Sequence, residues 1–203
     1  GLFAGLTVDA AVTDAIAQAY RALGESVAVA VRSSATAEDL GGASFAGQQE
    51  TFLNVHGEAA VVDAVRRCWA SGWSARAIDY RSRAGFASGD VAFAVVVQVM
   101  VDVASSGVMF TANPDNGRLE QTVINAAWGL GESVVGGTVT PDTVVVEPDA
   151  GVVVSRDTAD KTVWTRPLAE GTTEEPLPEA RRRAPVLSDA DAVALARLGQ
   201  RVE

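Results

Sequence analysis

Hydrophobic periodicity changes once along the chain, near Gly89, and that change restricts the possible folds more than any other feature. Before this point, apolar residues recur every three or four positions over 8–23 and 58–83, which is the spacing of one face of an α-helix. Two short apolar strands are expected between these helices, at 27–31 and 51–55. After Gly89, strand-like segments follow one another at 91–101, 106–112, 122–128, 143–147 and 152–156. The pattern predicts an α+β fold, with a helical first part and a mostly antiparallel sheet behind it.

The two ends of the sequence indicate a piece of a longer protein. The chain begins at Gly1 without a methionine, and its last residues carry an unfinished helix pattern. Ser188 and Asp191 form a capping box, after which apolar residues recur on one helical face up to the end. Residues 166–187 hold four prolines and mixed charges, and they are expected to form a surface loop or linker. We expect 188–203 to be the start of a helix that leads into further chain.

Charge and cysteine content exclude several classes of protein. The formal net charge of -10 argues against binding to nucleic acid or to an acidic membrane surface, since both need pooled Lys and Arg. No apolar run reaches about 18 residues, so no membrane span is expected. Cys68 is the single cysteine and cannot form an internal disulfide, which favours a reducing compartment and a cytoplasmic location.

Arg32 stands at the end of an apolar strand and is followed by some twenty residues with almost no bulky side chains. One interpretation is a core ion pair with Glu38, Asp39 or a more distant carboxylate, because an unpaired buried charge is costly. The other is a phosphate group of a ligand, which a guanidinium binds bidentately.

The segment after Arg32 favours the phosphate. Gly41, Gly42 and Gly47, with Ser44 and Ala46 between them, allow backbone N–H groups to approach an anion without interference from Cβ atoms. The segment lacks the GxxxxGK[ST] pattern of a P-loop. Arg32 and this glycine-rich segment together predict an anion site.

Gln98 is a polar amide within an apolar strand, and it must find hydrogen-bond partners. Either the backbone satisfies it inside the core, or it contacts a purine edge or sugar hydroxyl above an apolar floor of Val97 and Met100. Glu132 has two interpretations, a metal ligand or a carboxylate in a turn, and the turn is favoured. His56, Trp69 and Trp73 are interpreted as structural.

Five segments together resemble one known family: "VAVRSSATAEDLGGASFAGQQETFLNVHG", "CWAS…RAIDYR", "AVVVQVMV", "SGVMFTANP" and "INAAWGLGESVVGGTVTPDT". In sequence and order they are similar to the nucleotide-binding domain of the phosphoenolpyruvate synthase, pyruvate phosphate dikinase and rifampin phosphotransferase family. The resemblance covers most of residues 27–203. It implies an ATP-grasp-like lobe, with 1–165 as the central part of the domain and both ends incomplete.

The resemblance also implies an activity. In this family ATP gives its β-phosphoryl group to a carrier histidine on another domain, which then passes it to pyruvate or a small-molecule hydroxyl and leaves AMP and phosphate. Arg32, Gly47, Thr51 and Gln98 match ATP-contacting positions, and Ser44 and Ala46 are candidate phosphate-loop contacts. The implied cofactors are ATP and Mg²⁺, and the implied partners are phosphohistidine and acceptor domains of the same longer chain.

The sequence departs from the family pattern at its ends. The family's N-terminal lysine would precede Gly1, and its magnesium ligands and second arginine would follow Glu203. His56 does not match the carrier histidine, so no catalytic residue is expected in this chain, which alone would be inactive. The alternative is a non-catalytic nucleotide-binding or regulatory module.

Overall fold

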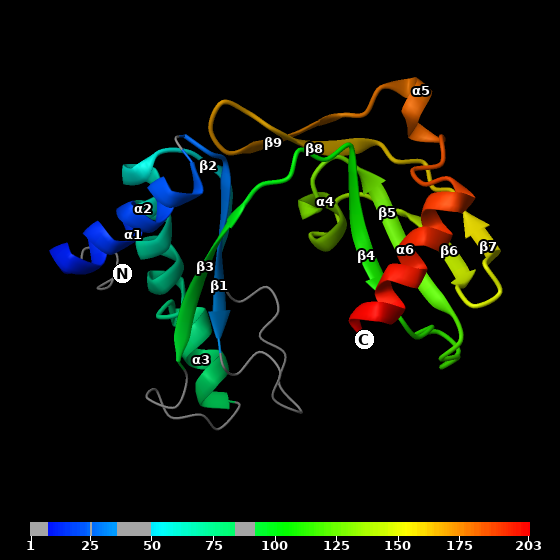
Figure 1. The fold of residues 1–203 in the computed structure, drawn as a ribbon, viewed down its shortest axis with the longest axis horizontal. Helices are drawn as coiled ribbons and strands as arrows, with labels where there is room; N and C mark the ends of the chain where they lie inside the picture. Colours follow the sequence, from blue (N-terminus) through cyan, green and yellow to red (C-terminus); the bar gives the residue numbers. More distant parts are fainter. Residues whose placement is uncertain (1–7, 25, 36–49, 84–91) are drawn as a thin grey trace. The chain divides into compact units, whose positions relative to one another are not determined.

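The computed structural model describes residues 8–24, 26–35, 50–83 and 92–203 of the chain. It contains helices together with antiparallel sheets, so the expected α+β class is confirmed. The helices are α1 (Ala10–Leu23), α2 (Glu58–Ser71), α3 (Ala75–Arg83), α4 (Glu132–Val135), α5 (Glu179–Arg182) and α6 (Asp189–Val202). The strands are β1 (Val29–Ala35), β2 (Thr51–Val55), β3 (Phe93–Val99), β4 (Ser105–Phe110), β5 (Thr122–Trp128), β6 (Asp142–Glu147), β7 (Val152–Asp157), β8 (Val163–Pro167) and β9 (Thr172–Pro176) (Figure 1).

The chain forms two compact units. Unit 1 contains Gly1–Val101 together with the short segment Leu168–Gly171, and unit 2 contains Asp102–Pro167 and Thr172–Glu203. Within the described residues of either unit, no helix combines the length and the apolar character that crossing a membrane requires.

Unit 1 is a three-stranded antiparallel sheet with two helices packed against one face. The strand order is β2-β1-β3, so β1 is hydrogen-bonded on both sides. β1 continues beyond its expected end at Val31 and includes Arg32. Helices α1 and α2 contribute the residues that cover the sheet (Figure 1), and the buried cluster consists of Tyr20, Val29, Val31, Val61, Ala64, Val65 and Cys68.

The expected helix over 58–83 is divided into α2 and α3 at Gly72. A Cβ atom at this glycine would lie 2.8 Å from the ring of Phe93, so the chain turns where it presses on β3. The Arg81 guanidinium donates to the Gly72 carbonyl and lies 5.2 Å from the Phe93 ring centroid. Burial lowers the pKa of this guanidinium. Helical periodicity alone did not reveal the break, because the apolar face continues across it.

Cys68 is a buried structural thiol in this core. It is 1% exposed, and its Sγ donates to the carbonyl oxygens of Val31 and Glu50 at 3.6 and 3.4 Å. Burial, aided by the negative charge of Glu50, raises the pKa of the thiol to about 11. Since only the thiolate is an efficient nucleophile, the folded protein should protect this residue from alkylation.

We therefore expect iodoacetamide at pH 8 to modify native Cys68 about a hundredfold more slowly than the urea-unfolded chain. Because the folded thiol keeps its proton to higher pH than the unfolded thiol, stability should fall as pH rises from about 9 towards 11. Mass spectrometry of timed samples measures the first effect, and urea unfolding across this pH range measures the second. Equal alkylation rates in the two states would contradict the assignment.

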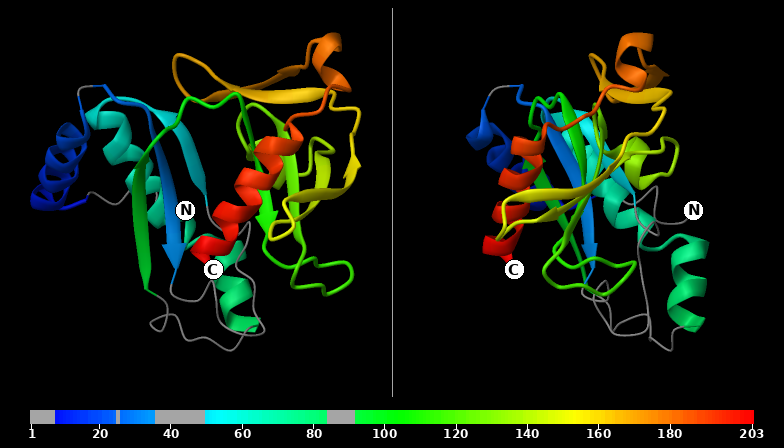
Figure 2. Two further views of the ribbon diagram at one scale, coloured as in Figure 1. Left: turned by 45° about the vertical axis from the view of Figure 1, so that its right-hand side comes forward. Right: turned by 90° about the vertical axis from the view of Figure 1, so that its right-hand side faces the viewer.

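Unit 2 is a four-stranded antiparallel sheet in the order β4-β5-β6-β7. The β6–β7 hairpin turns at 148–151, between the two strands expected at 143–147 and 152–156. α6 packs against all four strands (Figure 2) and buries Ala192 and Ala196 on Ile124, Val144 and Val146. Its N-cap is Ser188, whose Oγ accepts from the amide of Asp191 at 3.1 Å, and this confirms the expected capping box.

Residues 166–187, expected as a loop or linker, contain regular structure. β8 and β9 form a two-stranded antiparallel ribbon, and α5 follows it. The charged residues that suggested a loop lie on this narrow ribbon, where Arg166 and Glu175 approach within 3.5 Å. A two-stranded ribbon buries little apolar surface, so its strands need not show a hydrophobic repeat.

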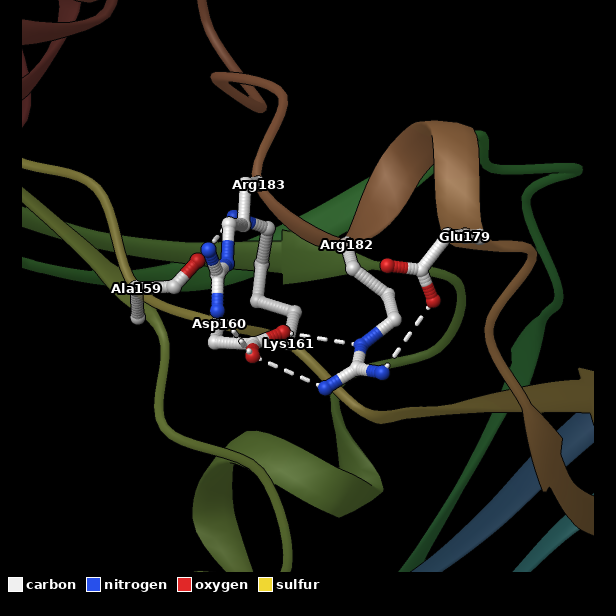
Figure 3. A network of polar contacts seen from close by, with 6 residues as sticks. All are labelled: Ala159, Asp160, Lys161, Glu179, Arg182 and Arg183. Carbon is white, nitrogen blue, oxygen red and sulfur yellow. Dashed lines mark hydrogen bonds and ion pairs between the residues drawn. The ribbon is translucent and has the colours of Figure 1, made fainter.

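A buried ion pair in unit 2 joins Lys161, just before β8, to Asp142, the first residue of β6. The Lys161 ammonium and the Asp142 carboxylate are 2.5 Å apart, and their side chains are 0% and 1% exposed. Asp142 also accepts backbone hydrogen bonds from Ala159 and Val186, at 3.0 and 2.8 Å. The neighbouring residue Asp160 instead pairs at the surface with Arg182 and Arg183 (Figure 3).

Candidate functional site

Arg32 and Thr51 lie directly opposite each other in the sheet of unit 1. Arg32 on β1 pairs with Thr51 on β2 and with Val96 on β3. Residues in register on neighbouring strands project from the same face, with Cβ atoms about 5 Å apart. The guanidinium and the hydroxyl therefore start from adjacent points on one face of the sheet.

Gln98 belongs to the same face. It pairs with Ala30, which is two residues from Arg32 on β1, so Gln98 lies diagonally from Arg32 at a Cβ separation of about 7–8 Å. The opposite face is the one that helices α1 and α2 cover, since Val29, Val31, Val95 and Val97 all pack in that core. Arg32, Thr51 and Gln98 are all exposed, so the face that carries them is open to a ligand.

The side chain of Arg32 forms no ion pair with any residue that the structure describes. The proposed core ion pair would have needed Glu38 or Asp39, which lie outside the described residues, or a distant carboxylate. Arg32 is exposed and lies on the face of the sheet away from the helices, so it is not part of the core of unit 1. An exposed guanidinium at the centre of a sheet is chemically suited to an anionic ligand.

The apolar floor near Gln98 differs from the expected one. Val97 packs into the core of unit 1 and so cannot lie beside Gln98. Val96 is the valine that shares the Gln98 face, and it is 49% exposed. The sequence alone could have predicted Val96 instead of Val97, because residues two apart in a strand share a face.

Three of the sequence candidates lie outside the described residues: Gly47, Ser44 and Ala46. Thr51 is the first residue of β2, and Arg32 is the middle residue of β1.

The remaining candidates have structural partners. Glu132 accepts a hydrogen bond from the Thr172 hydroxyl at 2.8 Å. His56 lies between the Ser26 carbonyl and the Asn54 side chain, and Trp69 packs on the core of unit 1. No group of three or more His, Cys, Asp or Glu side chains suited to a metal ion occurs among the residues in the described ranges.

Sequence reasoning missed Asn54, a residue of β2 that is 4% exposed and has a φ of 56°. Its side chain holds the segment Leu168–Gly171, which is more than a hundred residues away in sequence. No local pattern reports such a contact. The one available signal was an asparagine within an otherwise regular strand, since asparagine is tolerated at positive φ.

Comparison of the sequence with known proteins identifies its family. The family model for the pyruvate phosphate dikinase, AMP/ATP-binding domain matches residues 2–203. A probable phosphoenolpyruvate synthase of Pyrococcus abyssi is 44% identical over 214 residues, which cover 100% of this chain and 26% of the relative. A second one, from Methanothermobacter thermautotrophicus, is 49% identical over 180 residues, or 88% of this chain and 26% of the relative.

A rifampicin phosphotransferase of Streptomyces sviceus is 48% identical over 190 residues, which cover 93% of this chain and 22% of the relative. The chain therefore spans about a quarter of the length of the curated relatives that it matches. The family expected from the sequence motifs is confirmed by a match over nearly all residues. The chain belongs to the pyruvate phosphate dikinase, AMP/ATP-binding domain family.

Proposed function

We propose that the exposed sheet face of unit 1 binds the ATP of a dikinase-type phosphotransferase. The observation that supports this most is the placement of Arg32, Thr51 and Gln98 on one open face, although 19 residues separate Arg32 from Thr51 and 66 separate it from Gln98. Arg32 would neutralise the phosphates, Thr51 would add a hydroxyl contact, and Gln98 would orient the nucleoside. Gly47, Ser44 and Ala46 would supply backbone N–H groups to the phosphates.

The complete protein would then transfer the β-phosphoryl group of ATP to a carrier histidine on another domain, and from there to an acceptor. The names of the relatives suggest two acceptor classes: pyruvate, as in a phosphoenolpyruvate synthase, or a hydroxyl of a rifamycin-type drug. Phosphoryl transfer needs mainly positioning and charge neutralisation from the protein, and these are the roles assigned to the sheet face. A cytoplasmic location fits the single reduced Cys68.

The described residues do not by themselves form a site for Mg²⁺. No cluster of three or more His, Cys, Asp or Glu suited to a metal ion occurs among them. In the proposed complex the phosphates of ATP would be ligands of the ion. We assign no step to it.

Calorimetric titration of Mg-ATP into the full-length protein tests the proposal, with Gln98→Leu as the diagnostic variant. We expect saturable binding, weakened about tenfold by a substitution that keeps the volume but removes one amide hydrogen bond. Gln200→Leu is the control, because Gln200 is an exposed glutamine of α6 whose side chain donates to Asp149 in unit 2. An unchanged affinity in Gln98→Leu would remove Gln98 from the site, and absence of Mg-ATP binding would overturn the proposed function.

A further inference from the structure

Strand β2 contains an irregularity at Asn54. Val29 pairs with Val55, but Val31 pairs with Phe52, so two residues of β2 lie opposite the single residue Ala30. This extra residue is a β-bulge, and the positive φ of Asn54 is part of it. A bulge turns a side chain away from the direction that regular alternation would give it. Here the bulge turns Asn54 towards the segment Leu168–Gly171, which belongs to unit 1.

Asn54 binds this segment through three hydrogen bonds. Its side-chain Nδ2 donates to the backbone carbonyl oxygens of Leu168 and Gly171, at 2.6 and 2.9 Å. The backbone carbonyl of Asn54 accepts from the Gly171 amide at 3.2 Å. Asn54 is only 4% exposed, so water does not compete freely for these groups. We call this arrangement the Asn54 clamp.

The side-chain amide of Asn54 also contacts His56. The Nδ2 group must face the two carbonyl oxygens, which leaves Oδ1 as an acceptor for the His56 Nε2, 3.0 Å away. The other ring nitrogen of His56 lies 3.2 Å from the Ser26 carbonyl. The adjacent Gly57 amide donates to the Tyr20 hydroxyl at 2.9 Å, so the end of β2 is tied to helix α1.

The clamp lies where the sheet is weakest. β2 has β1 on one side only, and the bulge interrupts its ladder opposite Ala30. A slip of one residue in such a strand turns its side chains to the other face. Thr51 would then face the helices instead of the open face that carries Arg32. On its other side, Ala30 of β1 pairs with Gln98 of β3. The bulge at Asn54 therefore lies across the sheet from a proposed nucleotide contact.

We propose that Asn54 is a positioning residue of the nucleotide site: by clamping Leu168–Gly171 onto β2, it holds the register that presents Thr51 beside Arg32. The link to ATP rests on the proposed function. The Asn54 clamp rests on the hydrogen bonds alone and does not depend on that function.

Hydrogen exchange and Mg-ATP titration of the full-length protein test the two parts separately. Asn54→Gly keeps the freedom to adopt positive φ and removes the side-chain hydrogen bonds. Asn54→Asp keeps the size and the tolerance of positive φ, but it turns a carboxylate towards two carbonyl oxygens. Asn116→Gly is the control, because Asn116 is an asparagine of a unit 2 turn that bonds to Gln121.

We expect both Asn54 variants to raise amide exchange at Gly171 and at residues 51–53 by about fivefold or more, with Mg-ATP affinity about tenfold lower. The control should change neither. If Asn54→Gly does not fold, the exchange and affinity of Asn54→Asp give the same test.

Three results would overturn parts of the inference. Unchanged exchange at Gly171 and 51–53 would disprove the clamp, whatever happens to ATP. Faster exchange with unchanged Mg-ATP affinity would disprove the positioning role. A wild-type protein that does not bind Mg-ATP would overturn the proposed function and the positioning role with it, whereas the exchange data would still decide whether the clamp exists.

Discussion

Replacing Arg32 with alanine is expected to abolish ATP-dependent phosphoryl transfer by the full-length protein while unit 1 remains folded. The side chain is exposed and has no ion-pair partner among the described residues, so its loss should cost the fold little. A charged hydrogen bond contributes about 1.5–3 kcal/mol, and a bidentate phosphate contact contains two of them. The loss should therefore weaken Mg-ATP binding at least about a hundredfold. Calorimetry measures the affinity, a transfer assay the activity and thermal unfolding the stability.

Two further variants make this prediction specific. Arg32→Lys keeps the charge but lacks the planar pair of donors, so it should recover only part of the affinity. Arg118→Ala removes an exposed arginine of unit 2 that pairs with Glu120, and it should leave Mg-ATP binding unchanged. The assignment of Arg32 would be wrong if Arg32→Ala retained most of the transfer activity, or if Arg118→Ala reduced binding equally.

Replacing Lys161 with methionine should destabilise unit 2 by about 3–5 kcal/mol, because it leaves the Asp142 carboxylate buried without its counter-charge. Two backbone amides would still donate to that carboxylate, but neither carries a full charge. Urea unfolding, followed by fluorescence from Trp128 and Trp164 of unit 2, gives the free energy of unfolding.

The double variant Lys161→Met with Asp142→Asn should recover part of this loss, since it removes the unpaired charge. Arg182→Ala is the matched surface control: its contact with Asp160 (Figure 3) is partly exposed, at 30% and 35% for the two side chains, and its loss should cost about 1 kcal/mol or less. A loss below about 1 kcal/mol in Lys161→Met would show that the ion pair is not needed for stability.

Sequence periodicity predicted the elements whose signal is local. The hairpin of β6 and β7 has a turn-forming sequence between two apolar strands, and α6 begins at a recognisable capping box. The ribbon of β8 and β9 was missed, because Thr165 is its single buried residue and its strands show no hydrophobic repeat. The break between α2 and α3 was missed because it depends on Phe93, a residue of a distant strand.

The candidate site divides in the same way. Arg32 and Gln98 were chosen as candidates because each is a polar residue in an apolar strand, which is a local anomaly. Their common face depends on the pairing of β1 with β3, and that pairing joins segments more than fifty residues apart. The part played by Asn54 depends on an even longer contact, with Leu168 and Gly171. Such long-range pairings follow from the fold as a whole and not from any short window of sequence.

In strands β1 and β3 of unit 1, residues that pack in the core alternate with residues on the outer face. In β1 and β3 the odd-numbered residues Val29, Val31, Val95 and Val97 pack in the core, and the even-numbered Arg32, Val96 and Gln98 face outward. Substitutions at Arg32, Val96 and Gln98 therefore leave the packed valines untouched, whereas Ala30, also even-numbered, is 2% exposed and tolerates less change. Ligand preference can diverge among relatives through these three outward-facing positions, without compensating changes in the core. The same division gives protein engineers a set of positions to randomise that should not threaten folding.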